Sequence, residues 1–82
     1  MATNTPDVRQ YAEAIDCVRD AHVAGVSTGR WARMSDVELV ERIEANAAEL
    51  RAAEKRGDAE ACHEHATALA AMAIEYLARG LA

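Results

Sequence analysis

Two long helical patterns in the second half of the chain are separated by only two residues, Gly57 and Asp58. Glycine favours the left-handed backbone that ends a helix, and an aspartate just after it can cap the start of the next helix. Because a connection this short turns the chain back on itself, the two helices must run antiparallel. The sequence therefore predicts a tight hairpin of helices over about residues 36–56 and 59–79.

The start of the first hairpin helix carries a clear capping signal. Ser35 and Glu38 have the spacing of a capping box, in which each side chain accepts a hydrogen bond from a free backbone N–H. Met34 and Leu39 flank this box at the positions of a hydrophobic staple. Together these residues predict that the helix begins at about residue 36.

A third helix is predicted nearer the N-terminus, over about residues 6–24. Thr5 is the expected N-cap, with Pro6 in the first turn, and Gly25 is the expected left-handed stop. Apolar side chains recur behind Pro6 at intervals of three and four, which places one stripe along the helix: Val8, Tyr11, Ala12, Ile15, Val18 and His22. Residues 1–5 are expected to form a short N-terminal arm.

No segment alternates β-branched or aromatic residues with polar ones, so the chain is predicted to be an all-α three-helix bundle forming one domain over residues 1–82. Twenty of the 82 residues are alanine, and phenylalanine is absent. Alanine removes little surface from water, and a chain this short builds only a small core. Self-association or docking onto a partner is the expected way to gain further burial.

The second half of the last helix favours self-association. Between Ala66 and Ala78 the only polar groups are Thr67, Glu75 and the hydroxyl of Tyr76. Two other helices cannot cover a helix that is apolar on every side. A homodimer is therefore expected through the residues Leu69, Ala70, Ala73, Ile74 and Leu77. The alternative is that the first helix and the arm cover this face.

The formal charge of −5 argues against a direct nucleic-acid partner. All of the excess lies in residues 35–64, where nine acidic side chains outnumber four basic ones. No signal peptide or membrane span is visible, so a cytoplasmic protein with reduced Cys17 and Cys62 is expected. Eight arginines against one lysine, with abundant alanine, suggest a bacterial or phage genome.

The segment between the first two helices is a candidate partner-binding site. Arg30, Trp31 and Arg33 have the composition of an interface hot spot. The alternative is that Trp31 plugs the open end of the bundle and leaves both arginines in water.

A second candidate partner-binding surface is the acidic face of the helix over residues 36–56, which carries Glu38, Glu41 and Glu44. Small acidic helical proteins can occupy a positively charged groove that otherwise holds nucleic acid. Two interpretations of this face are therefore open: it belongs to an acidic inhibitor, or it is simply a helix face in contact with solvent.

The densest group of metal-ligand residue types is Glu60, His63 and Glu64. Glu60 and His63 have the Glu-x-x-His spacing of carboxylate-bridged di-iron bundles. One chain holds a single copy of this motif, so only a dimer could complete such a site. No cofactor is expected for the chain on its own.

These patterns favour a small acidic interaction module that self-associates and acts as an adaptor or regulator of another protein, with a phage or mobile element as a candidate source. Catalysis is not expected, because no pair of groups has both the spacing and the enclosure that a reaction needs. The acidic inhibitor and the dimer-dependent metal protein are the two alternatives.

Overall fold

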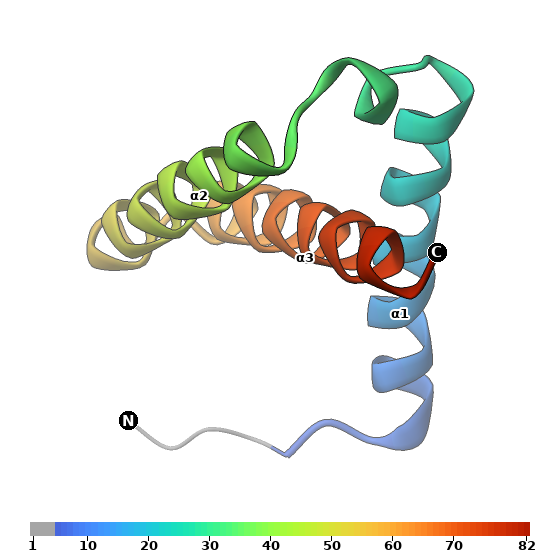
Figure 1. Ribbon diagram of the computed structural model, residues 1–82. Helices are drawn as coiled ribbons and strands as arrows, with labels where there is room; N and C mark the ends of the chain where they lie inside the picture. Colours follow the sequence, from blue (N-terminus) through green and yellow to red (C-terminus); the bar gives the residue numbers. More distant parts are fainter. Residues whose placement is uncertain (1–4) are drawn as a thin grey trace.

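The computed structural model describes residues 5–82 and confirms the all-α three-helix prediction (Figure 1). Helix α1 spans Val8–Ser27, a short 3-10 helix η1 spans Trp31–Arg33, α2 spans Asp36–Arg56 and α3 spans Ala59–Leu81. No strand occurs within residues 5–82. Residues 1–4, which belong to the expected arm, lie outside the described part of the chain.

The predicted hairpin of α2 and α3 is confirmed in its caps and its turn. The amide of Glu38 donates to Oγ of Ser35 over 3.1 Å, and the amide of Ser35 donates to the Glu38 carboxylate over 3.3 Å. Gly57 ends α2 with a left-handed φ of 70°, and Asp58 caps α3 by accepting from the amide of Ala61 over 3.0 Å. Local sequence therefore determines how α2 starts and ends, how α3 starts, and how the two helices meet.

The predicted start of α1 is wrong by two residues. Asp7, and not Thr5, is the N-cap, and α1 begins at Val8. Asp7 and Gln10 form a capping box with two hydrogen bonds of 2.9 Å, each running from a backbone amide to the other residue's side chain. This reciprocal pair satisfies two free amides, whereas a cap at Thr5 with proline behind it would satisfy fewer.

Gly25 does not end α1, which contradicts the prediction that it is the helix stop. The helix continues to Ser27, and the left-handed residue is Gly29, with a φ of 74°. Gly25 is buried because the indole of Trp31 lies against it, and a Cβ there would stand 2.2 Å from the ring. The residue is therefore a close-approach glycine within the helix. Similarly, α3 runs to Leu81, two residues beyond its predicted end at about residue 79, and Gly80 lies inside it.

Helix α1 crosses the hairpin steeply on the α3 side, and its N-terminal half extends beyond the hairpin (Figure 1). The core lies where α1, η1 and the hairpin meet. Its buried members are Trp31, Leu39, Ala71 and Met72, and the partly buried side chains around them are Val18, Ala21, Met34, Ile43 and Ala68.

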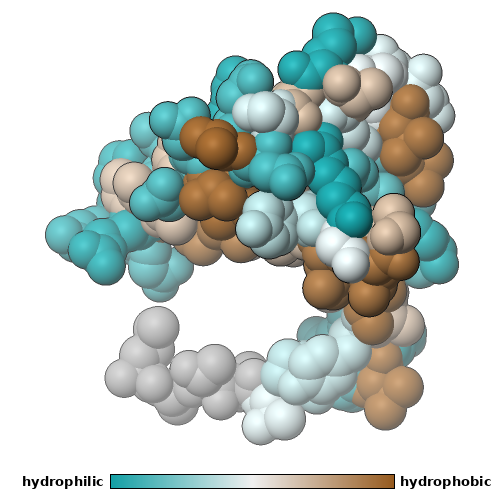
Figure 2. All heavy atoms as spheres, in the orientation of Figure 1, coloured by the Kyte–Doolittle hydropathy of each residue, from teal (hydrophilic) through white to brown (hydrophobic). Residues whose placement is uncertain are grey.

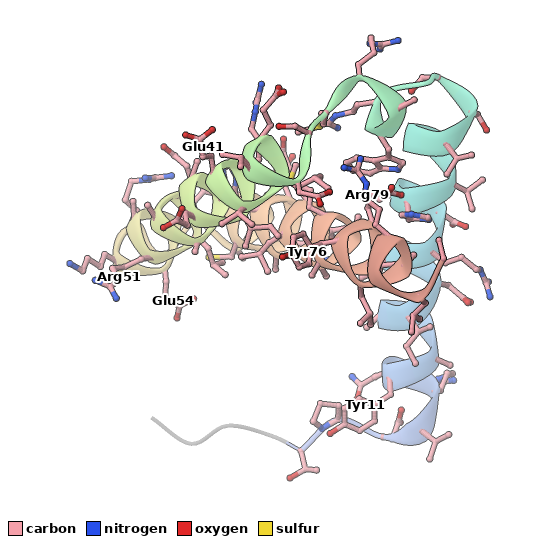
Figure 3. All side chains as sticks on the ribbon, viewed as in Figure 1. Tyr11, Glu41, Arg51, Glu54, Tyr76 and Arg79 are labelled. Carbon is pink, nitrogen blue, oxygen red and sulfur yellow. The ribbon has the colours of Figure 1, made fainter. Side chains whose placement is uncertain are left out.

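The apolar stripe predicted for α1 exists, but the chain covers only its C-terminal part. Val18 and His22 are half-buried against α3, whereas Val8, Tyr11 and Ile15 are more than half exposed. Tyr11 projects into the angle between α1 and the hairpin (Figure 3). The periodicity was therefore sufficient to define a face, although it could not show how much of that face another helix would cover.

We expect Gly25→Ala to lower the free energy of unfolding by about 2–4 kcal/mol, because the added methyl group overlaps the Trp31 ring. Urea unfolding at one fixed protein concentration measures the change. Gly80→Ala is the matched control, since nothing lies within 4 Å of its Cβ position. Because Gly80 lies one residue before the end of α3, the control should change stability by less than about 0.5–1 kcal/mol. Equal effects of the two changes would contradict the role given to Gly25.

Candidate functional site

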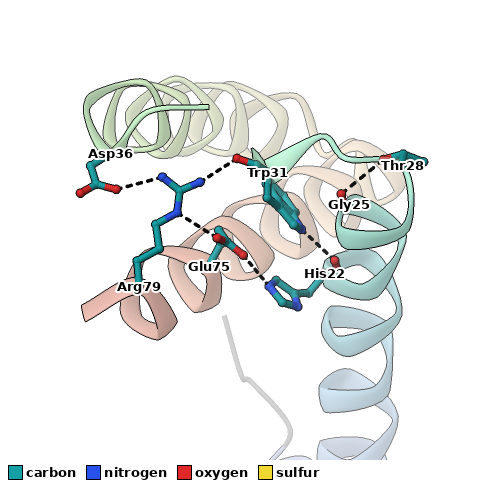
Figure 4. A network of polar contacts seen from close by, with 7 residues as sticks. All are labelled: His22, Gly25, Thr28, Trp31, Asp36, Glu75 and Arg79. Atoms are coloured by element: carbon teal, nitrogen blue, oxygen red, sulfur yellow. Dashed lines mark hydrogen bonds and ion pairs between the residues drawn. The ribbon is translucent and has the colours of Figure 1, made fainter. Parts of the chain in front are cut away.

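A polar network joins all four helical elements beside Trp31 (Figure 4). The guanidinium of Arg79 in α3 is its centre. Nε of Arg79 donates to Glu75 over 2.9 Å, Nη1 donates to Asp36 at the start of α2 over 2.9 Å, and Nη2 donates to the carbonyl of Trp31 over 2.7 Å. One side chain therefore ties α3 to both α2 and η1.

The second oxygen of Glu75 connects the network to α1. It accepts from Nε2 of His22 over 3.0 Å, and only 16% of the Glu75 side chain is exposed. The hydrogen bond from Arg79 lowers the pKa of Glu75 below its ordinary value, against the opposing effect of burial, and the contact with His22 lowers it further. The same pair raises the pKa of Arg79. Glu75 is therefore held as a carboxylate between two donors.

Trp31, which the sequence offered either for partner binding or as a plug, lies inside the protein with 4% of its surface exposed. Its indole N–H donates to the carbonyl of His22 over 2.8 Å, and its ring stacks on the His22 imidazole with centroids 5.8 Å apart. Arg30 covers the ring with its guanidinium carbon 5.2 Å from the centroid. Arg33 is exposed and donates to the carbonyl of Thr28. Only the two arginines present their side chains to a partner.

The largest set of exposed apolar side chains lies along α1 and α3, and we call it the crossing surface. It consists of Val8, Tyr11, Ile15, Ile74, Leu77 and Leu81. Ile15 and Ile74 line a common hollow of about 280 Å³ where the two helices cross. The other members follow at intervals of three or four along each helix. Figure 2 shows hydrophobic side chains gathered where the end of α3 meets α1.

The five residues predicted for self-association divide into two groups. Leu69 and Ala70 are half-buried within the chain, whereas Ala73, Ile74 and Leu77 are exposed. The structure therefore places the free part of the predicted surface in the last two turns of α3. The alternative that α1 covers this face holds only near the crossing point.

The acidic residues predicted for partner binding on α2 have different surroundings. The Glu38 carboxylate belongs to the helix cap, while Glu41 and Glu44 are exposed. Glu41 and Glu44 border a shallow hollow of about 300 Å³ that also includes Tyr76 and Val40.

Glu60, His63 and Glu64 line a cavity of about 510 Å³ between α1, η1 and α3. No group of three or more histidine, cysteine or acidic side chains in the described chain could hold a metal ion. A metal here would need donors from a second copy. Cys17 and Cys62 are both free thiols. The pKa of Cys62 is raised, mainly by burial and to a smaller extent by the nearby Glu54 carboxylate.

Two features of the structure were not predicted from the sequence. The exposure of Val8, Tyr11 and Ile15 was missed because a regular stripe looks the same whether or not a neighbour covers it. The contact of His22 with Glu75 joins positions 53 residues apart, and no local pattern indicates it. The spacing of Glu75 and Arg79 is a visible signal, because residues four apart on a helix form ion pairs.

Compared with protein-family models, curated proteins and solved structures, the chain matches none of them. None of the helices in the part of the chain that the structure describes has the length and apolar character to cross a membrane.

We expect Glu75→Gln to lower the free energy of unfolding at pH 7 by about 1–2 kcal/mol, since a charge-assisted pair is lost. Because the pKa of Glu75 is lowered from 4.5, the pair contributes fully above pH 4.5 and its contribution is lost as the pH falls through the lowered pKa. The variant should therefore lose less stability on acidification than the wild type. Urea unfolding from pH 7 to pH 3 tests this, with the exposed Glu49→Gln as the control. Parallel pH profiles for Glu75→Gln and the wild type would contradict the assignment.

Proposed function

We propose that this protein is a small acidic interaction module of the cytoplasm that self-associates through the crossing surface and regulates or links other proteins, without catalysis of its own. The observation that carries the proposal is the crossing surface, where six large apolar side chains are 41–85% exposed along two helices. Contiguous apolar patches of this kind mark interaction sites in soluble proteins.

The total exposed surface supports a second copy as the occupant. The chain exposes 6152 Å², whereas a compact monomer of 8.8 kDa exposes about 4,800 Å². The excess is more than about 1,000 Å², and one partner in a typical stable interface buries about 800 Å². The radius of gyration of 13.8 Å also exceeds the value of about 12 Å for a compact chain of this length. A dimer of modest size would therefore account for the open shape.

A symmetric dimer uses the same surface on both copies, so the crossing surface must fit itself. Its two rows of side chains diverge from the hollow at Ile15 and Ile74, which leaves an apolar angle that a second such surface can fill. The excess charge of −5 lies in residues 35–64, with −2 on α2 and −3 from Asp58, Glu60 and Glu64, whereas residues 1–34 and 65–82 each sum to zero. Pairing through these two helices therefore brings little like charge together.

An acidic inhibitor of a nucleic-acid-binding protein is the second candidate function, supported by the exposed Glu41 and Glu44 on α2. Its binding would weaken steeply as salt rises, because exposed charges are screened. The third candidate is a metal protein completed by a dimer, using Glu60, His63 and Glu64. Elemental analysis of the dimer distinguishes it, since that candidate requires stoichiometric metal.

We expect the wild type to elute as a dimer of about twice 8.8 kDa in size-exclusion chromatography with light scattering. Leu77→Glu and Ile15→Glu should each give monomers, because a buried unpaired carboxylate in the interface is costly. Val26→Glu is the matched control, since Val26 is 59% exposed at the other end of α1. Circular dichroism checks that each variant is helical. A monomeric wild type, or a dimer that survives both changes, would contradict the proposed surface.

A further inference from the structure

The cavity of 510 Å³ has the form of a groove along one side of α3, and we call it the α3 groove. Its floor consists of Trp31, Ala68, Ala71 and Met72, and its α1 wall is Cys17 and Ala21. Because four of these six side chains are alanine or cysteine, a neighbouring backbone can approach closely. None of them belongs to the crossing surface.

The rim of the α3 groove carries an unequal distribution of charge. Glu60 and Glu64 stand one turn apart on α3, and neither forms an ion pair with another residue of the described chain. The one cation on the rim, Arg30, lies over the ring of Trp31. The edge formed by α3 is therefore negative, and it belongs to the segment that holds the whole excess charge of −5.

The inside of the α3 groove favours a helix over a small polar ligand. A specific small-molecule site places polar groups inside the pocket to orient its ligand. Here the polar side chains lie at the rim, and the described chain has no buried polar or charged residue. The groove runs from Glu60 to Met72, which is about 18 Å of helix, or three turns. These dimensions suit an apolar stripe of a helix laid into a groove.

We propose that the α3 groove binds an amphipathic helix of a partner protein that carries lysine or arginine beside its apolar stripe. The stripe packs against Cys17, Ala21 and Ala68, over the buried Trp31 and Met72, and the basic side chains pair with Glu60 and Glu64. This rests on the proposed interaction role and names the chemistry of the partner, but it does not depend on self-association. Pairing with a basic partner also gives Glu60 and Glu64 a role, whereas the described residues of one chain do not form a metal site.

The test uses a synthetic amphipathic peptide with leucines at i, i+3, i+4 and i+7 and lysines on the flanking positions. Its twin has glutamate in place of every lysine. Alkylation of Cys17, which lines the groove, reports occupancy, and Cys62 is the internal control because it does not line the groove. Mass spectrometry follows the two thiols separately.

The saturating lysine peptide should slow alkylation of Cys17 about tenfold or more and change that of Cys62 less than about twofold. The glutamate twin should protect neither thiol. The double variant Glu60→Lys with Glu64→Lys should weaken peptide binding about tenfold or more. Glu49→Lys with Glu54→Lys is the matched control, because it makes the same change of net charge at exposed positions outside the groove and should cost less than about threefold.

Ile15→Glu separates this proposal from the dimer, since the variant should bind the lysine peptide as tightly as the wild type. Three results would overturn the groove proposal: no protection by the lysine peptide, equal protection by the glutamate twin, or equal losses in the two double variants. One further result would overturn the groove proposal. Without any peptide, Cys17 would become protected as the protein concentration rises, and Ile15→Glu would lose this protection, because a second copy would then occupy the groove.

Discussion

The contact of Trp31 with Gly25 holds the first third of the chain against the rest. A backbone without a Cβ lets the indole lie on α1, and the indole N–H then reaches the carbonyl of His22. The carbonyl of Trp31 in turn accepts from Arg79, which also holds Asp36 and Glu75. Packing and polar contacts thus support each other at one place, where the large side chains of a small core also meet. Any larger residue at Gly25 would push the Trp31 ring away from α1 and so disrupt all of these interactions at once.

The helices and their caps could be predicted from local sequence, because the groups that decide them are neighbours in the chain. Ser35 with Glu38, and Gly57 with Asp58, satisfy backbone groups within one turn. Gly25 was misread because a helix stop and a close approach both require glycine, and the residue that approaches is six positions away. Likewise, the start of α1 was predicted at Thr5 and Pro6, but the reciprocal hydrogen bonds of Asp7 and Gln10 place it two residues later.

The candidate surfaces could be predicted less well, since they depend on what covers each helix. The sequence indicated an apolar excess on α3, but Ile74 and Leu77 are exposed while Leu69 is half-buried, and the periodic pattern does not distinguish them. Glu60 and Glu64 were identified from the sequence as possible metal ligands, whereas the structure shows that they lie beside an apolar groove. The direction in which α1 leaves the hairpin fixes both surfaces, and that direction is set by Trp31 and His22 rather than by any periodic pattern.

The order of α1 before α3 in the chain has a consequence for synthesis. Helix α1 leaves the ribosome before α3, and the residues on which it docks, including Ala71 and Glu75, are made more than forty residues after it ends. The α2–α3 hairpin needs only local contacts and can form as soon as its own residues are available. The apolar stripe of α1 therefore stays uncovered while the hairpin is being made, and two chains growing on a shared messenger can pair through it during that time.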